Sequence, residues 1–271
     1  MSAPKAGLMY KNPFQKLHDI ILDNNFVYAR IIIFVCFFGH GLVSLNISPG
    51  YQLHYNIFSA ANFFGLDAHF FLRLLATFDI CMAFLFLFNV RLVYIIPVIL
   101  SYLFLVGLAG GIFYMKKTGG FFGISEFFRR LPWLFTVLFV WFKLKKERDY
   151  FFLLRVGLAF AFIAHGLSSL EFLGLRGGHI ELASQIMTSD SATKFVYYSG
   201  FSDTVIGLLL ITGLFSRWAA AIGCLWLVFI VYLSFLTGLP EGIFRTGFLL
   251  ICLYVAVDKR CHQWKNSGKS I

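Results

Sequence analysis

Residues 30–45, RIIIFVCFFGHGLVSL, and residues 155–170, RVGLAFAFIAHGLSSL, share one pattern. In both stretches an Arg stands ten residues before a His-Gly pair, and Ser-Leu follows that pair after a short gap. Polar residues further along recur at nearly constant offsets: His54 and His179, Asp79 and Asp203, Arg91 and Arg217, Glu126 and Glu241, Arg130 and Arg245. Because internal repeats fix the architecture of a chain, we predict two copies of a unit of roughly 110 residues.

The composition indicates a polytopic membrane protein. Hydrophobic residues make up 59% of the 271 positions, charged residues only 13%, and the mean hydropathy is +0.79. A helix needs about 20 mostly apolar residues to cross the hydrocarbon core. Eight stretches qualify: 27–47, 70–90, 92–115, 121–142, 151–173, 195–216, 218–238 and 240–257. Since the backbone in lipid must satisfy its own hydrogen bonds, we predict an all-α fold with eight transmembrane helices.

The repeat divides the chain into two units and three flanking segments. We expect an N-terminal cytoplasmic segment without a cleavable signal peptide before the units, with 13–24 either a short interfacial helix or a solvated amphipathic turn. The expected boundaries are 1–26 for this segment, 27–142 for the first unit, 143–150 for a charged linker, 151–257 for the second unit and 258–271 for a cytoplasmic tail. Four spans in each unit make the repeats parallel, and the short turns predict two four-helix bundles. The longer connection after the first span of each unit is expected to cap the outer mouth of its bundle.

The net charge of +10 is better explained by the orientation of the chain in the membrane than by nucleic-acid binding. Lys and Arg are more frequent on the side that carries both termini and the linker, which predicts that both termini are cytoplasmic. The expected partners of this charge are anionic lipids. The five cysteines have no C-x-x-C spacing, so neither a disulfide framework nor a metal site is expected.

Two ionisable pairs recur inside the spans, where a charged group needs a physical reason. His40 and Asp79 fall at comparable depths on the first and second helices of their unit, and His165 and Asp203 repeat this geometry. A His–Asp hydrogen bond within each unit satisfies both groups and fixes the imidazole tautomer. Proton transfer near a bound small molecule and a purely structural bond between two helices are both open interpretations.

Glu126 with Arg130, and Glu241 with Arg245, are spaced four residues apart near the outer ends of helices. That spacing places each pair on one helical face. The pairs serve either as ion pairs at the membrane interface or as a grip on an anionic or quinone oxygen.

His54 and His179 each follow the helix histidine by fourteen residues, as haem ligands do in di-haem cytochromes. Pro49-Gly50 and Gly177-Gly178 interrupt the helix between the members of each pair. We therefore expect one histidine in the bundle and one in the cap, without haem.

The stretches 153–172 and 200–223 resemble the first and second helices of the DoxX-like membrane family, through Arg155, His165-Gly166, Asp203, Gly207 and Arg217. The first unit is similar through Asp79 and Arg91, so the chain resembles a tandem duplication of that family's four-helix unit. Ser44 and Ser169 stand where the family often has Lys, and Asp79 and Asp203 where it commonly has Glu. The resemblance implies a bacterial inner membrane location and contact with membrane quinone, since the family includes the membrane subunit of thiosulfate:quinone oxidoreductases.

Three functions follow as hypotheses. The first is a quinone-binding membrane subunit of a redox complex, with His165, Asp203, His40 and Asp79 exchanging protons. Its quinone-binding residues would be Arg245, Glu241, Arg130, Glu126, His179 and His54. The second is a non-catalytic scaffold that anchors a partner complex through the caps. The third is a small-molecule or lipid permease that uses the interface between the repeats, which the lack of Gly/Pro-broken helices at matching positions within the spans disfavours.

Overall fold

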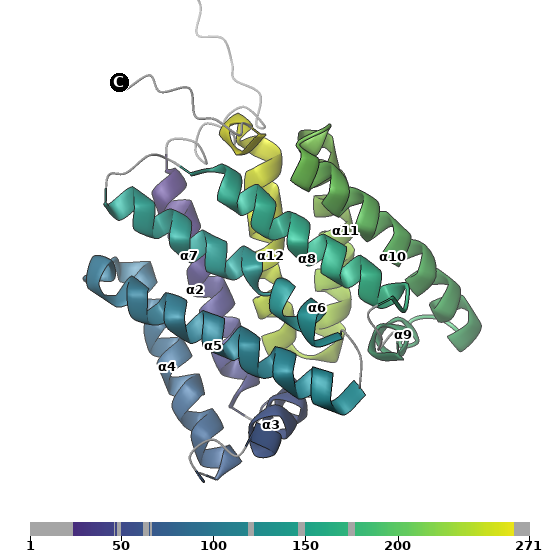
Figure 1. The fold of residues 1–271 in the computed structure, drawn as a ribbon, viewed down its shortest axis with the longest axis horizontal. Helices are drawn as coiled ribbons and strands as arrows, with labels where there is room; N and C mark the ends of the chain where they lie inside the picture. Colours follow the sequence, from purple (N-terminus) through teal and green to yellow (C-terminus); the bar gives the residue numbers. More distant parts are fainter. Residues whose placement is uncertain are drawn as a thin grey trace, which may run out of the picture.

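The computed structural model describes residues 24–262 apart from 46, 48–49, 62–64, 66, 119–121, 146–149 and 173–176. The predicted interfacial helix over 13–24 and most of the tail lie outside this range. The described part contains helices and no strand (Figure 1). The helices are α2 (Asn25–Val43), α3 (Gly50–Ala61), α4 (Ala68–Phe88), α5 (Leu92–Thr118), α6 (Phe122–Phe128), α7 (Leu131–Leu144), α8 (Phe152–Ser169), α9 (Gly177–Ala183), α10 (Ser189–Thr212), α11 (Ser216–Thr237), α12 (Leu239–Val257) and the short 3-10 helix η2 (Lys259–His262).

Seven helices are long and apolar enough to cross a membrane: α2, α4, α5, α8, α10, α11 and α12. The chain is thus an integral membrane protein, as its composition predicts. Large hydrophobic side chains such as Tyr94, Trp218 and Leu225 are mostly exposed on these helices. Exposed apolar surface of this kind is favourable in contact with lipid and unfavourable in contact with water.

The prediction of one continuous span over 121–142 is wrong. This segment consists of α6 and α7, separated by a turn at Arg129 and Arg130. The physical reason is Pro132, in the first turn of α7. A proline ring clashes with the carbonyl four residues earlier, here that of Phe128, which is where α6 ends. The break places Arg129 and Arg130 between the end of α6 and the start of α7.

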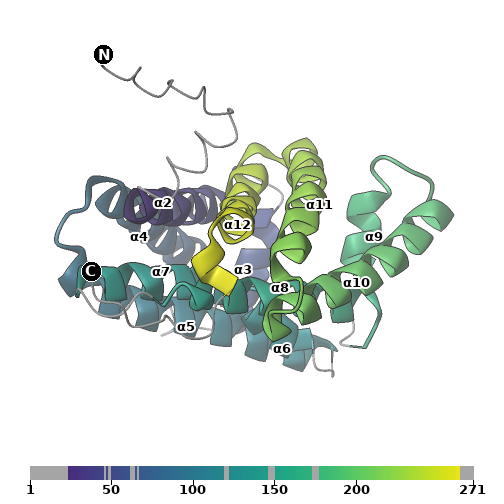
Figure 2. The same cartoon turned by 90° about the horizontal axis from the view of Figure 1, so that it is seen from above.

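The expectation of two separate four-helix bundles is also wrong, because the last helix of each unit packs across the boundary. Helix α12 of the second unit packs along α2 of the first, and α7 of the first unit packs along α8 of the second (Figure 2). The first and second helices of each unit, α2 with α4 and α8 with α10, remain paired within the unit. The outcome is one interlocked helical body in which equivalent contacts recur.

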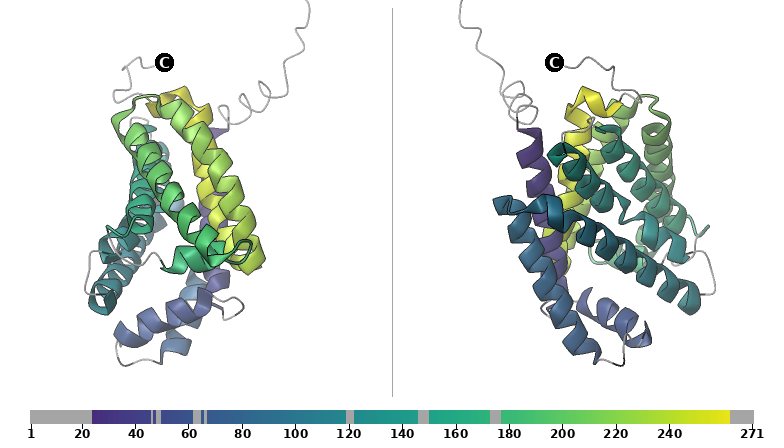
Figure 3. Two further views of the ribbon diagram at one scale, coloured as in Figure 1. Left: turned by 90° about the vertical axis from the view of Figure 1, so that its right-hand side faces the viewer. Right: turned by 60° about the vertical axis from the view of Figure 1, so that its left-hand side comes forward.

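Helices α3 and α9 form within the long connections and lie toward the end of the molecule opposite η2 (Figure 3). The start of α2 and the end of α12 share one end (Figure 1). This arrangement agrees with the predicted cap position of the connections.

Close helix contacts depend on glycines at two interfaces. A Cβ at Gly166 of α8 or at Gly207 of α10 would clash with the backbone of the other helix. At Gly39 of α2, a Cβ would clash with the backbone of Phe244 in α12. Gly213, in contrast, has φ of 82° and ends α10 as its C-cap. Its role is therefore a left-handed turn.

Candidate functional site

A cavity of about 380 Å³ lies between the two units. Its volume falls within the range of small-molecule sites, roughly 300–1,000 Å³. Eight of the ten residues proposed from the sequence line this cavity or the rim beside it: His40, His54, Arg130, His165, His179, Asp203, Glu241 and Arg245. Asp79 does not line it, and the side chain of Glu126 lies outside the described residues. The sequence pattern thus identified a set of groups that the fold brings together.

Both expected His–Asp pairs are present. His40 Nδ1 lies 2.7 Å from Asp79 Oδ2, and His165 Nδ1 lies 2.7 Å from Asp203 Oδ2. In each unit the bond joins the first helix to the second, α2 to α4 and α8 to α10. The carboxylate therefore orients its imidazole, whichever role the imidazole has.

The cap histidines lie against the histidines of the helices, stacked in the second unit and tilted in the first. The ring centroids of His165 and His179 are 4.3 Å apart with planes 28° from parallel, and those of His40 and His54 are 4.9 Å apart. As expected, the members of each pair lie on different helices. Their rings nevertheless meet, because α3 and α9 fold back over the helix ends.

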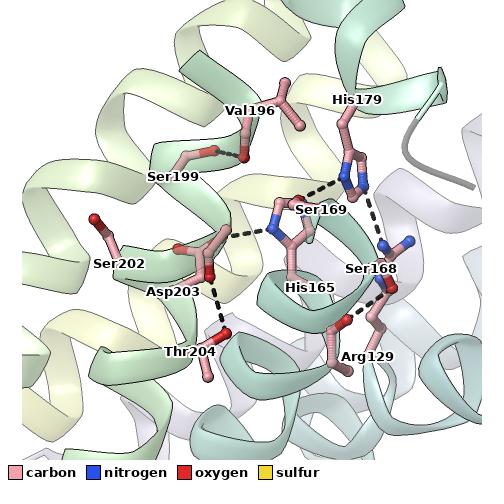
Figure 4. Close-up of polar contacts among 12 residues, drawn as sticks. Arg129, His165, Ser168, Ser169, His179, Val196, Ser199, Ser202, Asp203 and Thr204 are labelled. Carbon is pink, nitrogen blue, oxygen red and sulfur yellow. Dashed lines mark hydrogen bonds and ion pairs between the residues drawn. The ribbon is translucent and has the colours of Figure 1, made fainter. Parts of the chain in front are cut away.

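The hydrogen bonds of His179 define its tautomer. Its Nε2 lies 3.0 Å from Arg129 Nη2, and its Nδ1 lies 2.8 Å from Ser169 Oγ (Figure 4). Because a guanidinium only donates, Nε2 accepts and the ring proton is on Nδ1. In the first unit the Ser44 hydroxyl donates to the His40 carbonyl, so it accepts from His54 Nδ1, 3.0 Å away. Both serines thus hold the cap histidines, and neither forms a Ser–His nucleophile pair.

The cap histidines are held neutral. Burial lowers the pKa of His179 well below its usual value, and the charges of His165, Arg129 and Arg245 act in the same direction. Burial likewise lowers the pKa of His54, with contributions from His40 and Arg130. An unprotonated imidazole can stack against its neighbour without electrostatic repulsion.

The expected placement of Glu and Arg four residues apart on one helix is wrong for the first unit and holds in the second. Arg130 is outside α6, so it does not share a helical face with Glu126. Glu241 and Arg245 both lie on α12, where Glu241 Oε1 accepts from the backbone N–H of Gly50 at 2.8 Å. Since Gly50 begins α3, this contact ties a helix of the second unit to the cap of the first.

The two His–Asp pairs differ in exposure and in their remaining bonds. The His40 side chain is 8% exposed and Asp79 is fully buried, whereas the His165 side chain is 29% exposed. Asp79 Oδ1 accepts a second bond from the Tyr102 hydroxyl at 2.8 Å. Asp203 Oδ1 is buried and accepts no hydrogen bond from the described part of the chain. Asp79 is satisfied and lies away from the cavity, whereas Asp203 lines the cavity and keeps one unsatisfied oxygen.

The rest of the cavity is mainly apolar. Aromatic side chains contribute much of this wall: Phe162, Phe195, Trp226, Phe244 and Phe248. Flat apolar surfaces beside histidines and arginines fit an aromatic or unsaturated ring that carries oxygen atoms.

Arg129, Tyr102 and Trp226 are site residues that the sequence reasoning missed. Arg129 is adjacent to the repeated Arg130, but the second unit has no arginine at the equivalent position. Tyr102 and Trp226 share the offset of 124 that relates Asp79 to Asp203. An offset search restricted to polar residues could not pair a tyrosine with a tryptophan.

The fold and this cavity define a class: an all-helical membrane protein with a buried, histidine-rich and arginine-rich site between two similar units. Residues 150–236 match the family model named DoxX, so this part of the second unit is similar to the DoxX family, as the resemblance of its sequence implies. No curated protein and no solved structure matches the chain.

Proposed function

We propose that the chain binds a membrane quinone in the cavity between its units, as the membrane subunit of a redox complex. The observation that carries this proposal is the juxtaposition of the open His165–Asp203 pair with Arg129 and an aromatic wall. Quinone reduction requires two protons and two electrons at the ring oxygens. The electrons would come from a protein partner.

The residues present fit such a molecule. Arg129 and Arg245 lie at one cavity and donate hydrogen bonds only, which suits ring oxygens that accept. The His165 imidazole, oriented by Asp203, belongs to a class of side chain that can both accept and donate a proton. The aromatic wall excludes water from the oxygens and provides a face for the ring. The repeated contacts in the first unit support a tandem duplication of one DoxX-like unit. The similarity to the DoxX family supports the bacterial inner membrane as its location.

The test is an absorption spectrum of gently purified protein, followed by organic extraction and chromatography of the co-purifying molecules. We expect close to one quinone per chain, lost in His165→Ala and retained in His69→Ala. His69 is a matched control because it is exposed and does not line the cavity. Haem bands, or an empty protein that still binds a partner complex, would contradict the proposal. The empty protein would favour the scaffold.

A permease is a second candidate, and one observation favours it. The helix break at Arg129 and Arg130 opens directly onto the cavity, and broken helices commonly line the substrate sites of transporters. Helix α12, which holds the corresponding residues Glu241 and Arg245, is continuous over Leu239–Val257, so the break in the first unit has no match at that place in the second. Substrate-dependent uptake into vesicles that contain the purified chain alone would support transport, because the redox proposal requires a partner.

A further inference from the structure

The second carboxylate oxygen of Asp203 is a hydrogen-bond acceptor without a donor. The Asp203 side chain is 1% exposed, and Oδ1 has no hydrogen-bonding partner within the described residues. The residue nevertheless lines the cavity. A buried carboxylate oxygen that accepts no hydrogen bond destabilises the folded state, so native structures usually satisfy such groups.

The first unit shows how the same carboxylate is satisfied within the chain. Asp79 accepts from His40 through Oδ2 and from the Tyr102 hydroxyl through Oδ1. At the position that corresponds to Tyr102, the second unit has Trp226. The indole of Trp226 lies near Asp203, but Oδ1 accepts no hydrogen bond from it. The substitution of tryptophan for tyrosine thus removes an internal donor beside the cavity and leaves an acceptor directed to whatever occupies it.

Asp203 Oδ1 can accept a hydrogen bond whether the proton shared with His165 lies on the carboxylate or on the imidazole. The 2.7 Å bond between Asp203 Oδ2 and His165 Nδ1 contains that proton, so the lone pairs of Oδ1 remain available in either placement. A carbonyl oxygen in the cavity could not satisfy this atom, but a hydroxyl group could.

We propose that the bound molecule donates a hydroxyl hydrogen bond to Asp203 Oδ1, and that the site therefore prefers the hydroxylated, reduced form of its ring over the oxidised form. The inference rests on the proposed function and adds a preference between quinol and quinone. A hydrogen bond to a charged acceptor changes affinity by roughly tenfold or more.

The test measures binding of a short-chain benzoquinone and its benzoquinol to the full chain in lipid nanodiscs, by anaerobic titration calorimetry. The wild-type chain should bind the quinol at least about tenfold more tightly. Trp226→Tyr introduces an internal hydroxyl donor at the position corresponding to Tyr102, and it should abolish the preference. Trp226→Phe loses the same indole without adding a hydroxyl, and it should keep the preference.

A further variant tests the same hydrogen bond and leaves Trp226 unchanged. In Asp203→Asn the amide oxygen continues to accept from His165, so the amide NH₂ takes the place of Oδ1 and donates. The preference should then reverse toward the quinone. Equal binding of both forms, or tighter quinone binding, by the wild-type chain would overturn the inference and leave the proposed function intact. Binding of neither form would instead refute the proposed quinone site itself.

Discussion

At the residue scale, one residue difference separates two otherwise equivalent His–Asp pairs. Asp79 is completed by Tyr102, while Asp203 has Trp226 at the same position. The first pair therefore resembles a structural bond between helices, and the second has an acceptor still available to a ligand. The first pair thus fits the structural interpretation that the sequence left open, and proton transfer at the second pair stays a proposal.

The different bonding of the two carboxylates predicts different stability effects. Tyr102→Phe removes a hydrogen bond to a fully buried carboxylate, and it should cost about 1 kcal/mol of unfolding free energy in detergent. Trp226→Phe breaks no hydrogen bond, so it should lose only packing. Titration with a denaturing detergent, followed by circular dichroism, measures both. An equal loss in both variants would show that the Tyr102 bond contributes nothing specific.

The depressed pKa of His179 predicts a loss of stability in acid. The unfolded chain takes up a proton near the ordinary histidine pKa of about 6.5, whereas folded His179 stays neutral to a lower pH. Stability is therefore complete above about pH 6.5 and falls below it, by up to about 1.4 kcal/mol per pH unit for each such histidine. Thermal unfolding from pH 8 to pH 5 should show this slope. A smaller slope is expected in His179→Gln, and an unchanged slope would rule out this assignment.

At the scale of elements, short interruptions place the chemistry. Pro132 divides the fourth span and positions Arg129 against the cap helix α9. Gly50 begins α3 and donates its N–H to Glu241 of α12. Neither effect depends on a helix face, since both arise where helices begin or end and leave backbone and side-chain groups available to other elements.

The close contact of α2 with α12 predicts a strong effect of a single methyl group. Gly39→Ala would place Cβ against the backbone of Phe244, which cannot move without shifting α12. Overpacking of this kind typically costs about 1–3 kcal/mol. The melting temperature in detergent should fall, and quinone retention should fall with it because Phe244 lines the cavity.

Gly110→Ala is the matched control, because its Cβ would meet only ordinary contacts at 3.7 Å or more from the Arg130 side chain. Helix propensity favours Ala over Gly at both positions, so comparable losses in Gly39→Ala and Gly110→Ala would show that the contact with Phe244 does not determine the result.

At the scale of the whole molecule, the two units form one body. Helix α12 packs along α2, and α7 along α8. The cavity takes its walls from both units, with His40 and His54 from the first and His165 and His179 from the second. A single unit would therefore expose an apolar helix face and half of a site.

This interlocking predicts that the halves require each other. Residues 1–146 and 147–271, expressed together, should co-purify and retain the bound molecule, because α2–α12 and α7–α8 contacts re-form without the linker. Each half expressed alone should aggregate or be degraded. Affinity purification through a tag on one half gives the answer. Stable, monodisperse single halves would show that each unit folds as an independent bundle.

The sequence alone determined the features that depend on local periodicity and on the cost of burying charge. Long apolar runs predicted the membrane helices, and the repeated His and Asp residues predicted their pairing, because an ionisable group in a span requires a nearby partner. The tertiary structure decided what depends on contacts between distant segments. It joined each unit through its last helix to the other unit, brought the cap histidines onto the helix histidines, and left Asp203 open where Asp79 is closed. Local patterns carry no information about which of several equally apolar helix faces meet, so these features required the packed fold.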